Sequence, residues 1–201
     1  GKTYQCVTGS PATSAAMVMY YWNWPQNPVA SVASYTGTLN IGFDLSNEVT
    51  FTYPSLPATS FDWANMKDKY TTSYTTAQSN AVATLMRYVG QAEKMDYGIG
   101  GSSISSSQTN NIVNMYKTFG HDSGCRLVKK SSYSEANWAT LLQGEMTAGR
   151  PVVYCAIDTK GHDRHAFNVD GYNAGDNTYH INWGWDGIGN GYWTLNAFSD
   201  G

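Results

Sequence analysis

The chain has 201 residues, enough for one domain with a core of its own, so neither a metal nor a disulfide is needed to hold it together. Charged residues make up only 13% and the net charge is −3, so no basic surface points to nucleic acid or to an anionic membrane. No apolar run approaches the roughly 20 residues of a membrane-spanning helix. The polar, aromatic-rich and weakly charged composition favours a secreted or cell-surface protein.

The first strong segment, residues 12–22, is an apolar run with small side chains on one side. Ser10 is its expected N-cap and Pro11 its first helical residue, so a buried helix is predicted. The polar and β-branched residues 35–53 lack a steady period. We expect them to form a hairpin and covering loop.

Two more helices are predicted in the middle of the chain. Residues 77–89 repeat apolar side chains at four-residue steps, and Gly90 is the expected stop. Residues 108–119 are again helical in pattern and close on Gly120.

The last part of the chain changes from helical to strand-like patterns. Ser132 and Glu135 have the spacing of a capping box before a fourth helix, which should end at Gly149. Short aromatic and β-branched runs follow, separated by Gly, Asp and Asn, as is typical of antiparallel strands. The predicted strands are residues 151–158, 165–172, 178–185 and 191–198.

This order of elements predicts an α+β fold in which a helical half, about residues 1–125, packs against an antiparallel β-sheet half, about residues 126–201. Ligand sites favour the seam between two such halves, so a cleft is expected there. The whole of residues 1–201 is expected to be a single domain.

The three cysteines, Cys6, Cys125 and Cys155, are an odd number with no C-x-x-C pair. Their spacing predicts neither a zinc site nor a disulfide framework, and one bridge with one free thiol remains open. We expect no metal and no cofactor.

Among four histidines, only His165 begins a predicted strand, directly after a charged loop. Such a position suits a general base, because the imidazole is half-buried and still reaches a substrate. A histidine that merely hydrogen-bonds at a loop edge is the plainer interpretation of an isolated residue.

Asn182 and Trp183 follow on the next predicted strand, and a short hairpin loop brings Asn182 back beside His165. We expect the side-chain oxygen of Asn182 to accept a hydrogen bond from the imidazole over about 2.7–3.2 Å. This bond would fix the tautomer of the base, with the indole of Trp183 as its cover.

A nucleophile is expected at a helix N-terminus, where the helix dipole and free N–H groups stabilise a thiolate and an oxyanion. The residue at that place is Ser10, which by itself is an ordinary helix cap. Cys6 is the other candidate, but it lies four residues earlier and outside the helix start.

Residues 8–25 (TGSPATSAAMVMYYWNWP) resemble the catalytic segment of the streptopain family of cysteine peptidases, which has Cys-Val where this chain has Ser10 and Pro11. Further similar segments occur in the family's order. They are residues 95–98 (MDYG), 150–155 (RPVVYC), 164–172 (RHAFNVDGY) and 179–198 (YHINWGWDGIGNGYWTLNAF).

The resemblance implies a papain-like fold and a single peptidase catalytic domain, secreted by bacteria as a zymogen. The implied partners are protein or peptide substrates and the protein's own propeptide. Carried over by position, Ser10 occupies the nucleophile's place, His165 is the base, Asn182 orients it and Trp183 covers it. Arg164, where the family usually has glycine, and Trp185 are the expected substrate-binding residues. The alternative for Arg164 is that it points outward and pairs with Asp163 or with solvent.

Two departures from the family pattern matter. With serine at position 10, either the cysteine has been replaced to silence the enzyme or the chain is a natural peptide-binding pseudopeptidase. The family's oxyanion glutamine lies upstream of the nucleophile, and Gln5 is too near to take that role. The family also continues past the last aromatic strand with a glycine-rich loop and a closing strand. Flanking segments are therefore expected to be missing at both ends or to lie on a second chain.

Overall fold

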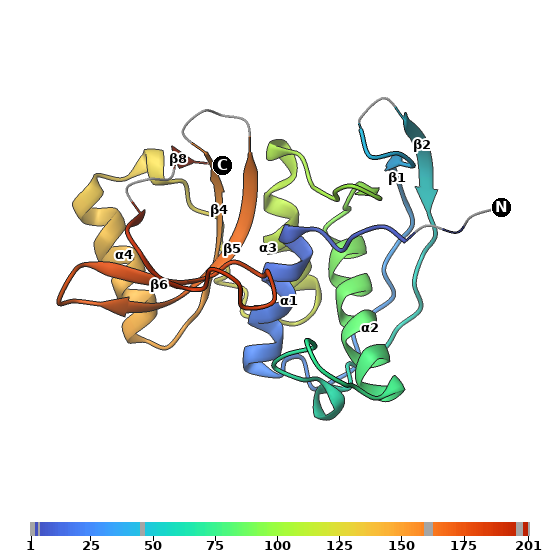
Figure 1. Ribbon diagram of the computed structural model, residues 1–201, viewed down its shortest axis with the longest axis horizontal. Helices are drawn as coiled ribbons and strands as arrows, with labels where there is room; N and C mark the ends of the chain where they lie inside the picture. Colours follow the sequence, from blue (N-terminus) through green and yellow to red (C-terminus); the bar gives the residue numbers. More distant parts are fainter. Residues whose placement is uncertain (1–2, 4, 45–46, 159–162, 196–198, 201) are drawn as a thin grey trace. The chain divides into compact units, whose positions relative to one another are not determined.

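The computed structural model describes residues 3, 5–44, 47–158, 163–195 and 199–200. The chain divides into two compact units, Gly1–Arg126 and Leu127–Gly201, and each has at least one helix and a sheet of its own (Figure 1). Among the described residues, no helix is long and apolar enough to cross a membrane. None of the three cysteines forms a disulfide.

In the described part of the first unit, the α-helices are α1 (Ser10–Trp22), α2 (Thr76–Ala92) and α3 (Asn110–Thr118). Small buried side chains of α1 allow the neighbouring helices to approach closely. The hydroxyl of Tyr116, on α3, donates to the carbonyl of Ala15 over 2.9 Å. The predicted buried helix is thus confirmed.

The start of α1 differs by one residue from the prediction. Its N-cap is Gly9, with φ +81°, and Ser10 is already helical. A Cβ atom at Gly9 would lie 2.6 Å from the carbonyl oxygen of Ser102, so only glycine fits. Ser10 therefore belongs to the first turn of the helix and does not cap it.

The predicted stop of α2 at Gly90 is wrong, because the helix continues to Ala92. A Cβ atom at Gly90 would press on the hydroxyl of Tyr97 and lie 3.4 Å from the Cβ of Ala12. Gly90 thus serves the packing of α2 against α1. At the end of α3 the prediction is confirmed, because Gly120 follows with φ +80°.

A three-stranded sheet completes the first unit, in the order β2-β1-β3. The predicted hairpin is confirmed as antiparallel β1 (Tyr35–Asn40) and β2 (Glu48–Tyr53). The two-residue β3 (Tyr97–Gly98) lies parallel to β1. Short 3-10 turns occur at Trp63–Asn65 and Ser106–Gln108 in this unit and at Lys130–Ser132 in the second.

In the second unit, helix α4 (Glu135–Thr147) accompanies an antiparallel sheet of order β7-β6-β5-β4-β8. The four predicted strands are confirmed, although residues 196–198 of the last one lie outside the described part. They are β4 (Val152–Ile157), β5 (Arg164–Asn173), β6 (Thr178–Asn182) and β7 (Gly191–Trp193), and the sheet also has a strand that was not predicted, β8 (Ser199–Asp200).

The N-cap of α4 is Ser134, whose hydroxyl accepts from the Asn137 amide over 3.2 Å. The predicted capping box at Ser132 is therefore wrong, because that residue belongs to the preceding 3-10 turn. Gly149, with φ +68°, follows the helix as predicted.

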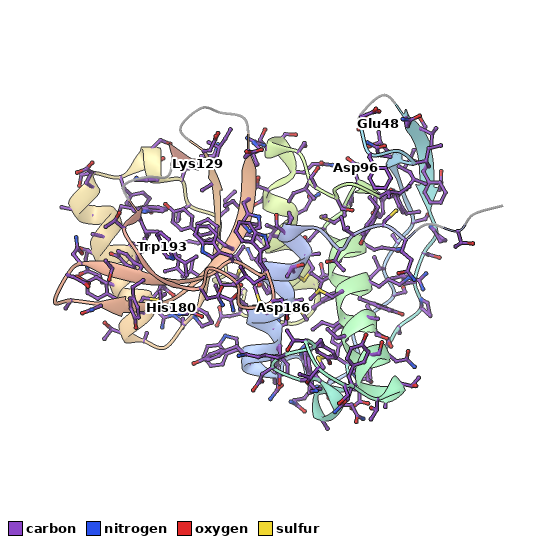
Figure 2. All side chains as sticks on the ribbon, viewed as in Figure 1. Glu48, Asp96, Lys129, His180, Asp186 and Trp193 are labelled. Atoms are coloured by element: carbon purple, nitrogen blue, oxygen red, sulfur yellow. The ribbon has the colours of Figure 1, made fainter. Side chains whose placement is uncertain are left out.

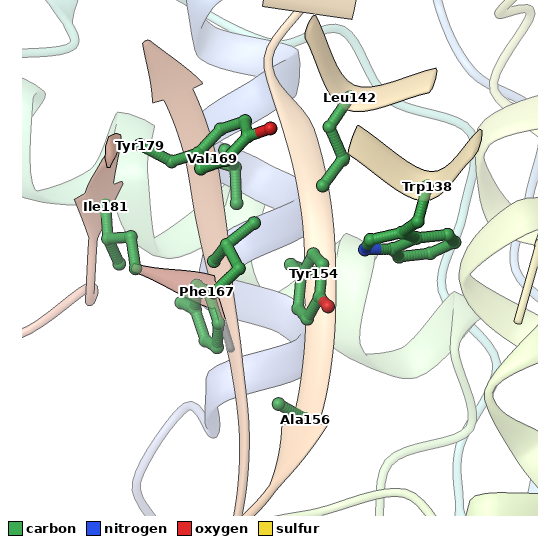
Figure 3. Packing of buried hydrophobic residues seen from close by; sticks show 9 residues of the cluster. Trp138, Leu142, Tyr154, Ala156, Phe167, Val169, Tyr179 and Ile181 are labelled. Atoms are coloured by element: carbon green, nitrogen blue, oxygen red, sulfur yellow. The ribbon is translucent and has the colours of Figure 1, made fainter. Parts of the chain in front are cut away.

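One face of this sheet forms the core of the second unit against α4 (Figure 3). Successive side chains of a strand point to opposite faces, so Phe167 and Val169 of β5 face the core while Asn168 faces away. This alternation decides which side chains reach the imidazole of His165. The buried cluster comprises Trp138, Leu142, Tyr154, Ala156, Phe167, Val169, Tyr179, Ile181 and Leu195.

Candidate active site

Ser10 is the first residue of α1 and is half-buried. The turn is held by Thr13, whose amide and hydroxyl both donate to the Gly9 carbonyl, over 3.1 and 2.9 Å. No acidic side chain lies in the first turn. Because helix N-termini carry partial positive charge and N–H donors, this end favours a developing anion beside position 10.

Cys6 lies in an extended segment that is fixed to β3, because the Val7 amide donates to the Gly98 carbonyl over 3.1 Å. Desolvation raises the pKa of the Cys6 thiol above its ordinary value. A raised pKa lowers the thiolate fraction at neutral pH. The sulfur at position 6 is thus poorly suited to be a nucleophile.

His165 is half-buried near the start of β5, and its Nε2 lies 2.8 Å from the backbone carbonyl oxygen of Trp183. A carbonyl oxygen only accepts hydrogen bonds, so Nε2 carries the proton in this contact. Nδ1 is then the nitrogen with the lone pair. The geometry therefore assigns the basic atom of the imidazole to Nδ1.

The expected hydrogen bond between His165 and Asn182 is not formed. Oδ1 of Asn182 accepts from the Gly184 amide over 3.0 Å instead. The reason is the register, which pairs Asn182 with Asn168, three residues from His165 on β5. Residues that pair across two strands have their side chains on the same face, so Asn182 shares the face of Asn168. His165 is an odd number of residues from Asn168, so its side chain lies on the opposite face of the sheet.

Both the backbone amide and the indole of Trp183 form hydrogen bonds. Its amide donates to Oδ1 of Asn190 over 3.0 Å, and its indole Nε1 donates to the carbonyl of Gly189, also over 3.0 Å. Its ring centroid is 6.1 Å from that of His165, whereas the ring of Trp185 lies at 4.8 Å. Trp185, rather than Trp183, is the nearer aromatic neighbour of the imidazole.

Arg164 is exposed, and in the described part of the chain it forms no ion pair. The expected alternative partner, Asp163, bonds through its amide to Oδ1 of Asp158 over 3.2 Å. His162 lies outside the described residues. Trp185 is 53% exposed, so its side chain is accessible to solvent.

Two features of the site have little signal in the sequence. The carbonyl that orients His165 is a backbone group, and every residue has one, so the residue type at that position does not indicate its role. Asn190 stands between two glycines in a turn, where asparagine is common for conformational reasons alone. The described residues contain no cluster of three or more His, Cys, Asp or Glu side chains that would suit a metal.

The family model of the peptidase C10 family matches residues 1–193. The chain belongs to this family. It is 30% identical over 192 residues to a streptopain of Streptococcus pyogenes. The matched residues make up 96% of this chain and 46% of that protein. It is 28% identical over 203 residues to the thiol protease/hemagglutinin PrtT of Porphyromonas gingivalis, covering 98% of this chain and 21% of that protein.

Among solved structures, active wild-type interpain A of Prevotella intermedia, a cysteine protease, matches with a TM-score of 0.77 and 32% identity, over 98% of this chain and 80% of that one. A fragment of prointerpain A from the same organism gives 0.76 and 31%, over 98% and 59%. These matches confirm the expected streptopain family and the papain-like α+β fold. The chain spans about half the length of the curated streptopains it matches.

Proposed function

We propose that this C10-family chain carries the machinery of a streptopain-type cysteine endopeptidase and that Ser10 keeps it inactive. The observation that supports this most is the imidazole of His165, whose Nε2 is bound to the Trp183 carbonyl and whose Nδ1 is left as a base. Ser10 lies in the first turn of α1, and the resemblance of residues 8–25 to the family's catalytic segment supports the proposal that it takes the place of the nucleophile.

The proposed reaction, with a thiol at position 10, begins when the sulfur gives its proton to Nδ1 of His165. The thiolate adds to the carbonyl carbon of a peptide bond, and N–H groups at the start of α1 stabilise the resulting oxyanion. The imidazolium then protonates the leaving amine as the C–N bond breaks. Water hydrolyses the thioester and restores the thiol and the neutral imidazole.

Serine does not support this cycle well. A thiol ionises near a pKa of about 8.5 before any tuning, and the helix end and an imidazolium lower that value further. An alcohol stays protonated under the same conditions, so no resident anion forms at position 10. We therefore propose that the chain with Ser10 is nearly inert towards peptide bonds.

The proposed substrates are proteins or peptides, and a propeptide is the proposed natural partner, in keeping with the pro-form of interpain A among the similar structures. We also propose that the protein is secreted. A side-chain oxyanion donor, in addition to the N–H groups at the start of α1, is proposed to come from a second chain or from further segments. Arg164 and Trp185 are the proposed substrate-binding residues, because both side chains are exposed on the unit that carries His165.

A second function, a peptide-binding pseudopeptidase, is favoured by one observation, which is Ser10 itself. A protein that only binds peptides does not need a histidine base held in a fixed orientation. The hydrogen bond between His165 and the Trp183 carbonyl therefore favours the peptidase over the pseudopeptidase. The sequence of codon 10 in the encoding gene separates an introduced serine from a natural one.

The experiment is hydrolysis of a denatured, dye-labelled protein by the Ser10→Cys variant, with and without His165→Ala. We expect proteolysis by Ser10→Cys alone, abolished by a thiol alkylator and reduced at least about 1,000-fold by His165→Ala. The variant carrying Cys6→Ala in addition should remain active. A folded Ser10→Cys protein that binds peptides but does not cleave them, even when upstream segments are supplied, would establish the pseudopeptidase instead.

A further inference from the structure

A second histidine, His180 on β6, forms a side-chain pair with Asp170 on β5. Its Nδ1 donates to Oδ1 of the carboxylate over 2.5 Å, and the two side chains are 33% and 34% exposed. The ring of Tyr192, on β7, stands edge-on to the imidazole at 5.3 Å. Figure 2 labels His180 on the sheet of the second unit.

The pair lies at an irregularity of the β5–β6 ladder. Val169 pairs with Ile181, but the next pair along is Gly171 with His180, so Asp170 is the additional residue of a bulge. A Cβ atom at Gly171 would lie 3.0 Å from the Cβ of His180. Glycine at this position thus allows the strands to stay close where the bulge interrupts them.

The bulge sets the register on the side where the candidate base is held. Beyond it, Asn168 pairs with Asn182, and the next residue, Trp183, offers its carbonyl to Nε2 of His165. A slip of one residue moves that carbonyl by about 3.3 Å and turns each side chain to the other face. Such a slip would remove the hydrogen bond that orients the imidazole.

We propose that Asp170 and His180 are positioning residues, which pin the bulge and thereby hold the Trp183 carbonyl on His165. The pair is outside the buried cluster that joins the sheet to α4, so its hydrogen bond is not part of the core packing. The effect of the Asp170–His180 pair on catalysis rests on the proposed peptidase function. Its effect on the position of the Trp183 carbonyl does not depend on that function.

The structural test uses the chain with Ser10 and follows hydrogen exchange by NMR. Asp170→Ala and His180→Leu remove the acceptor and the donor, respectively. Asp170→Asn and His180→Asn each retain a group able to make the same bond. The matched control is Asp176→Ala, which removes an acceptor of the Thr178 hydroxyl in the same hairpin, away from the bulge.

We expect Asp170→Ala and His180→Leu to speed exchange at least tenfold at the Nε2–H of His165 and at the β5–β6 amides between the bulge and Trp183. The β4–β5 amides should change little, and Asp170→Asn, His180→Asn and Asp176→Ala should stay within about threefold of the parent. Unchanged exchange at His165, or equally faster exchange throughout the second unit, overturns the proposal. The second of these results would mean a general loss of stability.

The catalytic test repeats the substitutions in the Ser10→Cys background. We expect kcat to fall about tenfold for Asp170→Ala and His180→Leu with KM within about twofold, and the two asparagine variants to recover most of the rate. If Ser10→Cys is inactive while the exchange results hold, the peptidase function fails and the positioning role stands. If the exchange results fail, the positioning role is wrong whatever the activity.

Discussion

Nε2 of His165 is held by the backbone carbonyl oxygen of Trp183, 2.8 Å away, and Asn182 acts one step further out, on the amide of Gly184. Asn190 holds the amide of the same tryptophan. The two asparagines therefore shape the turn that presents the carbonyl. Neither of these bonds involves the imidazole itself.

Removal of either asparagine should accordingly weaken the catalyst without abolishing it. In the Ser10→Cys background we expect Asn182→Ala and Asn190→Ala each to lower kcat about tenfold, because the carbonyl loses its fixed direction while the base remains. Asn173→Ala is the matched control, since Asn173 makes the same kind of bond to the Gly175 amide at the far end of the hairpin. A loss for Asn182→Ala as large as that for His165→Ala would show that Asn182 contacts the imidazole directly.

Arg164 should favour substrates with an acidic side chain near the cleavage site. Its guanidinium is exposed and forms no ion pair with the described residues, so it is available to a carboxylate. In the Ser10→Cys background, Arg164→Gln should lower kcat/KM for acidic peptides up to about fivefold and leave neutral ones unchanged, because exposed ion pairs are weak. Lys129→Gln, at another exposed cation (Figure 2), is the control. A peptide-library profile unchanged by Arg164→Gln leaves Arg164 without a role in specificity.

Glu93, at the end of α2, makes the stability of the first unit depend on pH. It is 0% exposed, and neither carboxyl oxygen has a hydrogen-bond partner among the described residues. Burial raises the pKa of Glu93 well above its ordinary value of 4.5. The unfolded chain releases this proton above pH 4.5 while the folded chain keeps it, so the free energy of unfolding falls as pH rises from there towards the raised pKa.

Glu93→Gln removes that titration and nearly preserves the shape of the side chain. We expect it to raise the free energy of unfolding by about 1–3 kcal/mol at pH 8 and to change it little at pH 4. Urea denaturation at the two pH values measures this, with the exposed Glu48→Gln as control. An equal effect at both pH values would mean that Glu93 does not hold its proton in the folded state.

The elements of the fold were predictable from the sequence because each has a distinct residue pattern. The buried helix is an apolar run, the hairpin is polar and β-branched without a steady period, and the four late strands are short aromatic and β-branched runs. Helix ends were less readable, since Gly90 has the residue type of a stop but a packing role, which depends on Tyr97 and Ala12 from other elements. Ser132 and Ser134 have the same residue type, so the sequence does not show which of them caps α4. The cap is Ser134, because the helix begins at the next residue, Glu135.

The strands that carry the site residues were predictable from the sequence. The hydrogen bond that orients the imidazole of His165 was not. His165 at a strand start and the Asn182–Trp183 turn beside it follow from the pattern of the hairpin. The orienting contact depends on the face of each side chain, and that face depends on the extra residue at Asp170. A bulge leaves no fixed sequence signal, so the sequence does not show that Asn182 and His165 lie on opposite faces of the sheet.

The most direct test of the proposed active centre is the alkylation rate of the Ser10→Cys thiol by iodoacetamide, measured at pH 6 by intact mass and peptide mapping. If His165 and the start of α1 form one thiolate–imidazolium centre, the introduced thiol reacts at least about tenfold faster than Cys6, and His165→Ala removes the difference. The contrary result is equally plain. If the introduced thiol reacts no faster than Cys6 in the folded protein, or if its rate does not change with His165→Ala, position 10 and His165 do not act together and the assigned catalytic pair is wrong.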